Sequence, residues 1–284
     1  TKSPIKRKWF IMKNINRLLH NIPIPGRKKK VGLALSGGST YGAAHVGVMQ
    51  VLEENGIRPD IIAGTSAGAL VGAAYCAGVP LNEIETLFRT MGWPSLLKIS
   101  IRNSLSIFDT QPMEDFLRKK IGDIEFKDLK IPFAAVACDI QTGEKVVLSS
   151  GPLAPAVRAS AAIPGLFSPV EIDGRLLVDG GIVDNLPIEQ VYTMGADYVI
   201  ASDVSKHGVT NKKLENPFEI LLAMTYIMQA RAALPNEDEC DCYIRPKVTQ
   251  YSSWGFKEVP QLLDAGREAT LPHIARLKRN LRLK

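Results

Sequence analysis

A serine between two glycines, each two residues away, is the segment of this chain best suited to chemistry. The segment Gly64-Thr65-Ser66-Ala67-Gly68 follows a short apolar run and precedes an alanine-rich stretch. On a sharp turn between strand and helix, a serine hydroxyl is lifted clear of the backbone, and Gly64 and Gly68 let the two elements approach closely. The helix N-terminus adds a positive dipole end beside that oxygen. We predict that Ser66 is a nucleophile; a simple tight turn is the alternative.

A serine hydroxyl needs a base at neutral pH, and the chain offers two kinds. The four histidines are His20, His45, His207 and His273. None stands in a context typical of a catalytic base, although a triad with His207 or His273 stays open. Asp179 follows an apolar run and precedes Gly180 and Gly181. A turn aspartate that bonds its own backbone is the alternative. We predict Asp179 as the base, because partial burial would raise the pKa of its carboxyl group toward the working pH.

A glycine-rich loop supplies a third element. The loop Ser36-Gly37-Gly38-Ser39-Thr40-Tyr41-Gly42 precedes a helix, and successive backbone N–H groups in such a loop form a cradle for an anion. We predict that the N–H groups of Gly37, Gly38 and Ser39 bind the oxyanion of an acyl-transfer reaction. A mononucleotide-binding loop is the competing interpretation, but the Gly-Lys-Ser/Thr ending of a P-loop is missing.

The cysteines do not indicate a metal site. Cys76, Cys138, Cys240 and Cys242 are few and irregularly spaced, which suits free thiols in a reducing compartment. Two cysteines at the spacing of Cys240 and Cys242 are too few for a zinc site. We therefore expect neither a metal nor a cofactor.

The segments around these motifs alternate between apolar strands and helices. A strand over 31–35, the glycine loop, a helix over 43–54 and a strand over 61–63 form a βαβ unit, which implies a parallel sheet. Further strands are predicted over 133–137, 145–148, 176–178, 198–201 and 242–245, and further helices over 67–77, 81–90, 111–120, 187–194, 217–231 and 258–280. The uncharged stretch 61–81 is long enough to span a bilayer. Its glycines and small side chains favour a buried strand, turn and helix instead.

The net charge of +6 is unevenly distributed. Residues 1–30 carry ten Lys or Arg and no acid, residues 31–266 carry 19 basic and 28 acidic residues, and residues 267–284 carry six basic residues and one acid. A nucleic-acid enzyme usually carries its positive charge around its site, so we expect no nucleic-acid partner. Basic appendages on an acidic body suit an anionic membrane surface better.

The arm over residues 1–30 has the pattern of a basic amphipathic helix. Its apolar residues fall near helical spacing at Trp9, Phe10, Ile11, Met12, Ile15, Leu18, Leu19 and Ile22. It lacks the long apolar region of a signal peptide. We expect a cytoplasmic protein whose arm contacts an anionic membrane at its periphery, and whose single domain covers residues 31–284. A helix packed on the body, or a solvated arm, is the alternative.

These motifs, in this order, resemble the patatin-like phospholipase family over about residues 31–205. The resemblance includes Gly42-Ala43-Ala44-His45 and the segment 159–164, with its Ile163-Pro164. It implies a Ser66–Asp179 dyad on a three-layer α/β/α fold with a mostly parallel central sheet, without histidine or metal. Within the family the chain looks like the compact bacterial type. Ser39 takes the place of a usual glycine, and Tyr41 that of a usual Arg or Lys.

The expected function is hydrolysis of a phospholipid, lysophospholipid or similar lipid ester through an acyl-enzyme. Two other functions stay open: an α/β-hydrolase-type Ser-His-Asp esterase, and a catalytically inactive lipid-binding or regulatory protein on the same fold.

Overall fold

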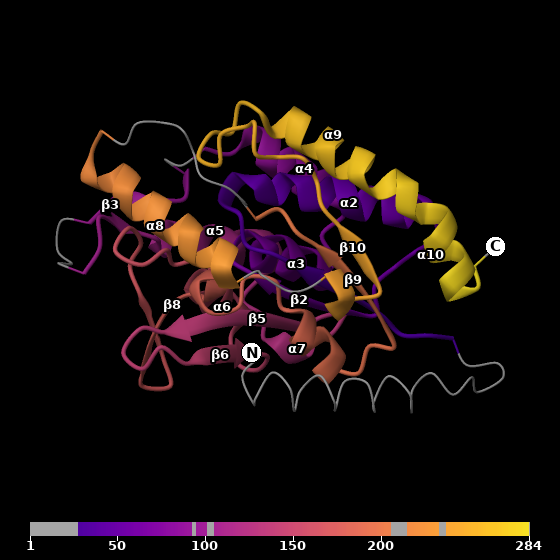
Figure 1. Ribbon diagram of the computed structural model, residues 1–284. Helices are drawn as coiled ribbons and strands as arrows, with labels where there is room; N and C mark the ends of the chain where they lie inside the picture. The colour runs from indigo at the N-terminus through magenta and orange to yellow at the C-terminus, as the bar shows by residue number, and fades with distance from the viewer. Residues whose placement is uncertain (1–27, 93–94, 101–104, 206–214, 233–236, 284) are drawn as a thin grey trace, which may run out of the picture.

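The computed structural model describes residues 28–92, 95–100, 105–205, 215–232 and 237–283 (Figure 1). Its strands are β1 (Val31–Leu35), β2 (Ile61–Thr65), β3 (Lys98–Ile99), β4 (Phe108–Asp109), β5 (Phe133–Asp139), β6 (Lys145–Leu148), β7 (Val170–Ile172), β8 (Arg175–Asp179), β9 (Tyr198–Ser202) and β10 (Cys242–Ile244). Its α-helices are α2 (Gly42–Glu54), α3 (Ala67–Ala77), α4 (Leu81–Thr90), α5 (Gln111–Ile121), α6 (Leu153–Ser160), α7 (Ile188–Thr193), α8 (Pro217–Ala232), α9 (Val259–Thr270) and α10 (Ile274–Leu281). Single 3-10 turns include η1 (Ser39–Tyr41), η4 (Gly180–Ile182) and η6 (Leu271–His273).

One eight-stranded sheet organises the described part of the chain. Its strands follow the order β10-β9-β1-β2-β5-β8-β7, and β6 pairs with β5. The run from β10 to β5 is parallel, whereas β6, β7 and β8 are antiparallel to their neighbours. All five residues of β1, of β2 and of β9 are buried, as expected for parallel strands covered on both faces. The predicted α/β fold with a mostly parallel central sheet is confirmed.

Strands β2 and β8 meet end to end along one edge of β5. In β5, Val136 pairs with Thr65 of β2 and with β6, so β2 and β6 lie on opposite edges. Ala137 pairs with Asp179 of β8 and again with β6. β2 and β8 therefore share an edge, and because they run in opposite directions, their carboxyl ends converge. The register alone brings the residue after Thr65 next to Asp179.

Helices cover both faces of the sheet. In Figure 1, α9 lies above α2, and the strands lie between these helices and α7 below. A Cβ on Gly47 of α2 would collide with the carbonyl oxygen of Leu263, and one on Gly266 of α9 with that of Ala44. The two helices thus touch at their backbones. Leu186, Ile188 and Val191 pack on the opposite face of the sheet.

Several predicted elements have different boundaries in the structure. The helix predicted over 258–280 is divided into α9, η6 and α10, since Pro272 cannot donate a backbone hydrogen bond. The short pairs β3–β4 and β7–β8 were not predicted. The stretch 61–81 forms β2, a turn, α3 and the first residue of α4. Among the described residues, no helix is both long and apolar enough to cross a membrane. The four cysteines are free and buried, and the arm over 1–27 lies outside the described residues.

Candidate active site

Ser66 occupies the turn between β2 and α3. Its backbone has φ 54° and ψ −119°, a region in which a non-glycine residue is strained and which often marks functional sites. A Cβ on Gly64 would meet the carbonyl oxygen of Gly68, and a Cβ on Gly68 would meet that of Leu35. Gly64 is therefore required by the close approach of β2 to α3, and Gly68 by that of α3 to the end of β1.

The hydroxyl of Ser66 donates a hydrogen bond to Asp179 Oδ2 at 2.5 Å. The other carboxylate oxygen, Oδ1, accepts from the backbone N–H of Gly181 at 2.7 Å. Gly180 lies so close to β5 that a Cβ would collide with the carbonyl oxygen of Val136. Asp179 is fully buried and Ser66 is 5% exposed. The two residues, 113 positions apart, thus form one buried contact.

Burial raises the pKa of Asp179 to about 6, against the lowering effect of its hydrogen bonds from Ser66 and Gly181. At neutral pH the group is mostly ionised and accepts a proton more readily than an ordinary aspartate. The carboxylate therefore has a pKa suited to a general base.

Ser160, at the end of α6, fixes the backbone of the turn at Ser66. The N–H of Ser66 donates to Ser160 Oγ at 3.0 Å, and that hydroxyl donates to the carbonyl oxygen of Val136 at 2.6 Å. The segment 159–164 entered the sequence analysis only through the family resemblance. A buried serine followed by two alanines gave no sign of this contact, because the partners are 94 residues apart.

The glycine-rich loop lies beside Ser66 but offers fewer donors than predicted. A Cβ on Gly37 would lie 3.1 Å from the Cβ of Ser66. The N–H of Gly37 already donates to the carbonyl oxygen of Asn185 at 3.1 Å, so the prediction of Gly37 as an oxyanion donor needs correction. Within the described residues, neither Gly38 nor Ser39 donates its N–H to a protein acceptor. Ser39 has φ 55°, which explains why glycine suits this position.

His45 supports the glycine-rich loop from inside the core. Its Nε2 lies 2.9 Å from the carbonyl oxygen of Ser36, and its Nδ1 lies 2.8 Å from Ser202 Oγ. Since a carbonyl oxygen only accepts, Nε2 carries the proton and Nδ1 accepts from the serine hydroxyl. Burial lowers the pKa of His45 to about 4, so the ring is neutral. It is a packed histidine, as the sequence analysis favoured.

None of the histidines that the structure describes contacts Ser66. His273 lies between α9 and α10, where its Nδ1 is 3.4 Å from Arg276 Nη2. His207 lies outside the described residues. The hydrogen-bond partner of the Ser66 hydroxyl is the Asp179 carboxylate.

Asn185 and Tyr41 hold the glycine-rich loop in place. The Asn185 side chain donates to Ser205 Oγ at 2.7 Å, while its backbone accepts from Gly37. Tyr41, where the family has a basic residue, is buried and donates its hydroxyl to the carbonyl oxygen of Tyr251 at 2.7 Å. The sequence analysis did not single out Asn185; the only sign was the polar pair Asp184-Asn185 shortly after the two glycines.

An apolar cavity of about 100 Å³ begins at Ser66 and runs along α3. Its wall includes Ser66, Leu70, Ala74, Ile84, Leu117 and Ile163. Ala74 lies eight residues beyond Ser66, which is about 12 Å along a helix. The cavity can therefore receive the apolar part of a group attached at Ser66.

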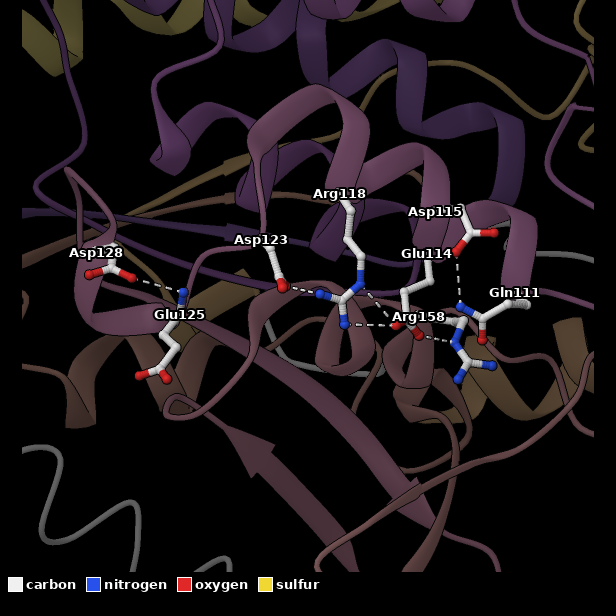
Figure 2. Close-up of polar contacts among 8 residues, drawn as sticks. All are labelled: Gln111, Glu114, Asp115, Arg118, Asp123, Glu125, Asp128 and Arg158. Atoms are coloured by element: carbon white, nitrogen blue, oxygen red, sulfur yellow. Dashed lines mark hydrogen bonds and ion pairs between the residues drawn. The ribbon is translucent and has the colours of Figure 1, made fainter.

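A partly buried ion-pair cluster joins α5 and α6 beside this cavity. Figure 2 shows Glu114 of α5 between two arginines, Arg118 on the same helix and Arg158 on α6. Glu114 accepts from Arg158 Nε at 2.7 Å and from Arg118 Nη2 at 3.0 Å, and Arg118 also pairs with Asp123. Because α5 carries Met113, Phe116 and Leu117 into the cavity wall and α6 ends at Ser160, this cluster ties the cavity to the turn at Ser66.

No three His, Cys, Asp or Glu side chains gather as metal ligands would, as far as the described residues extend. Cys240 and Cys242 lie on or next to β10 at the sheet edge, far along the strand order from β2 and β8.

The chain is similar to proteins of known family and structure. The model of the patatin-like phospholipase family matches residues 33–192. An uncharacterised NTE family protein of Mycobacterium tuberculosis is 41% identical over 61% of this chain and 48% of its own length. Lysophospholipase nte1 of Emericella nidulans is 29% identical over 88% of this chain and 18% of its own length. This chain thus spans about half, or less, of the length of these relatives.

Solved structures share the fold at low sequence identity. VipD from Legionella pneumophila superposes with a TM-score of 0.57 at 15% identity, over 88% of this chain and 67% of that chain. ExoU in its complex with SpcU, from Pseudomonas aeruginosa, gives 0.51 at 17% identity, over 88% and 52%. The family model covers more than half of the chain and includes the Ser66 turn, the glycine-rich loop and Asp179, so the chain belongs to the patatin-like phospholipase family.

Proposed function

We propose that this protein hydrolyses acyl esters of lipids, with Ser66 as nucleophile and Asp179 as general base. The observation that carries the proposal is the 2.5 Å hydrogen bond from Ser66 Oγ to Asp179 Oδ2 at the head of an apolar cavity. The relatives named as lysophospholipases and patatin-like phospholipases support a lipid ester as substrate.

In the first half of the reaction, Ser66 Oγ attacks the ester carbonyl carbon while its proton moves to Asp179 Oδ2. The carbonyl oxygen becomes an oxyanion, for which the N–H groups of Gly38 and Ser39 are the available donors. Each such donor is typically worth about 3 kcal/mol. Asp179 then gives the proton to the leaving alcohol oxygen as the carbon–oxygen bond breaks. An acyl-enzyme on Ser66 remains.

In the second half, water replaces the alcohol. Asp179, again ionised, takes a proton from the water as its oxygen attacks the acyl carbon. The tetrahedral intermediate collapses, Ser66 recovers its proton from Asp179, and the fatty acid leaves. The same carboxylate thus serves both halves of the cycle, as a base with a pKa of about 6 can.

The cavity favours one acyl chain over two. Its volume of about 100 Å³ leaves no room for two chains side by side. We therefore propose a lysophospholipid or another ester with one chain held in the protein as the preferred substrate.

We also propose that the basic arm holds the enzyme at the periphery of an anionic membrane on the cytoplasmic side. Residues 1–30 carry ten basic residues and no acid, and each basic residue near such a surface is worth about 1 kcal/mol. Deletion of residues 1–29 should weaken sedimentation with anionic vesicles most at low salt, since salt screens the attraction. Turnover of a short soluble ester should stay unchanged. Equal vesicle binding by the truncated chain would remove the membrane role of the arm.

The experiment that tests the activity compares Ser66→Ala and Asp179→Asn with the original protein on a lysophospholipid and on a short soluble ester. Each change should abolish hydrolysis, because nucleophile and base act as one unit. Asp109→Asn is the matched control, since Asp109 also ends a strand and accepts from the N–H two residues on, at Gln111. It should keep full activity. Turnover retained in Ser66→Ala would contradict the proposal, and binding of lipid without any turnover in the original protein would indicate an inactive lipid-binding protein.

A further inference from the structure

Helix α8 is apolar on both of its faces. Its 16 residues include only two charged ones, Glu219 and Arg231. A helix that is hydrophobic all round is normally buried. Yet Ile220, Met224, Ile227 and Met228, spaced as one helical face, are 46%, 53%, 62% and 44% exposed.

The inner face of α8 covers the active site. Gln229 is buried, and two of its side-chain atoms lie 2.8 Å from the position that a Cβ on Gly181 would occupy. Leu222 belongs to the same buried cluster as Ile163 and Phe167, which line the cavity. The exposed face of α8 is therefore the outer side of a helix that lies directly over Asp179-Gly180-Gly181.

The β3–β4 hairpin presents further apolar side chains beside the same cavity wall. Ile99 is 75% exposed and Leu105 is 58% exposed. The hairpin is fixed to the loop 163–168, because the N–H of Phe108 donates to the carbonyl oxygen of Leu166 at 2.8 Å. That loop also approaches α8, since Leu221 lies about 3.9 Å from a Cβ placed on Gly165. Hairpin and helix thus flank one loop of the cavity.

We propose that an apolar rim, defined as Ile99, Leu105, Ile220, Met224, Ile227 and Met228, inserts into a lipid surface and delivers an acyl chain to the cavity. This inference rests on the proposed lipid hydrolysis. A rim built from two elements on either side of the acyl cavity serves a substrate that must leave a lipid layer to reach Ser66.

The charges around the rim suit a lipid surface of any head-group charge. The rim itself has no charged residue. Lys98, next to Ile99 on β3, and Arg231, in the last turn of α8, are exposed and can extend to head-group phosphates while their stems lie along apolar surface. Glu219 turns back to the start of α8, where it accepts from the N–H of Glu215 at 2.9 Å. At 16 residues, α8 is too short to span a bilayer, so it lies in the interface.

Rim and arm predict different salt dependence. Attraction of the arm to anionic lipid falls with salt, whereas burial of apolar side chains does not. Vesicles of zwitterionic phosphatidylcholine in 0.5 M salt, a concentration that screens charges to within about 5 Å, therefore suppress the electrostatic attraction of the arm. A comparison of rim variants in the full chain, whose arm is unchanged, then measures the contribution of the rim.

The test measures sedimentation of the full chain with these vesicles, using Ser66→Ala so that lipid is not consumed. Adding Met224→Glu with Ile227→Glu should weaken binding at least about tenfold, because two side chains that would be buried become charged. Leu271→Glu is the matched control: Leu271 is 58% exposed but belongs to η6, between α9 and α10, and Figure 1 shows α10 at the opposite end of the molecule from β3. It should change binding less than about twofold. Equal binding by the rim variant and the control would overturn the proposal.

A second measurement covers the case in which the double variant fails to fold. A polarity-sensitive fluorophore on Ile227→Cys should shift to the blue when phosphatidylcholine is added, while the same probe on Leu271→Cys should not; the native cysteines are all buried. A blue spectrum at Ile227→Cys before lipid is added would mean that the arm or a second copy of the chain covers the rim, and would overturn the proposal. A rim that binds lipid in a protein with no Ser66-dependent turnover of a soluble ester would refute the proposed activity alone.

Discussion

Replacement of Asp179 by Asn should abolish hydrolysis and at the same time stabilise the folded protein. The asparagine Oδ1 can still accept from the N–H of Gly181, and its Nδ2 can donate to Ser66 Oγ, so both hydrogen bonds of the carboxylate have a replacement. What the substitution removes is a buried negative charge. Opposite signs for activity and stability are the expected behaviour of a group kept for chemistry and not for folding.

The size of the stabilisation follows from the pKa. Burial raises the pKa of Asp179 from its ordinary 3.8 to about 6. The folded state therefore binds its proton more tightly than the unfolded state, and the free energy of unfolding falls as the pH rises from 3.8 to 6. At about 1.4 kcal/mol per pH unit, the full difference is about 3 kcal/mol, reached above pH 6. About 2 kcal/mol of it should appear between pH 4.5 and pH 8.

Urea unfolding of both proteins at these two pH values measures the effect. The quantity of interest is the free energy of unfolding of Asp179→Asn minus that of the original protein. Other titrating groups cancel in this difference, including Asp184, whose pKa burial also raises to about 6. The difference should be larger at pH 8 than at pH 4.5. A difference that is constant, or that shrinks with rising pH, would show that burial does not raise the pKa of Asp179.

The value of kcat/KM for a short soluble ester should fall below pH 6, about tenfold per pH unit, because protonated Asp179 cannot act as a base; a profile flat down to pH 5 would contradict this. Ala74→Leu, which narrows the cavity well beyond Ser66, should lower turnover of long-chain esters and leave short ones unchanged, and equal loss on both would argue against an acyl cavity. Arg158→Leu should lower the free energy of unfolding by about 1–3 kcal/mol, measured in urea, because Glu114 keeps only Arg118 as a partner. Hydrolysis should survive EDTA, since the proposed donors are backbone groups; full loss that calcium restores would contradict this.

The local part of the site could be predicted because adjacent residues dictate it. The apolar run before Gly64, the two glycines and the alanine-rich segment after Ser66 each specify one part of a strand–turn–helix. Asp179 could be proposed as the partner by its own pattern at the end of an apolar run. The register that brings the carboxyl ends of β2 and β8 together on β5 could not be predicted. The sequence of a strand does not indicate whether it pairs with its neighbour in the parallel or the antiparallel direction.

Long-range hydrogen bonds account for the remaining differences between the predicted and the observed site. Gly37 was predicted as an oxyanion donor because it stands in a glycine-rich loop, but its N–H is used by Asn185, which is 148 residues away. Ser160 and Glu114 act through partners on other elements in the same way. Such contacts depend on tertiary packing, which periodicity and spacing do not encode. The arm over 1–30 and its membrane contact stay predictions.

Covalent labelling by a fluorophosphonate, located by mass spectrometry, tests the central claim most directly. The reagent reacts with an activated serine, so the original protein should carry one label, on the peptide that contains Ser66. Ser66→Ala should carry none, Asp179→Asn should react at least about a hundredfold more slowly because its nucleophile lacks a base, and Asp109→Asn should react like the original. An unlabelled original protein, a label on another serine, or an unchanged rate in Asp179→Asn would contradict the Ser66–Asp179 account.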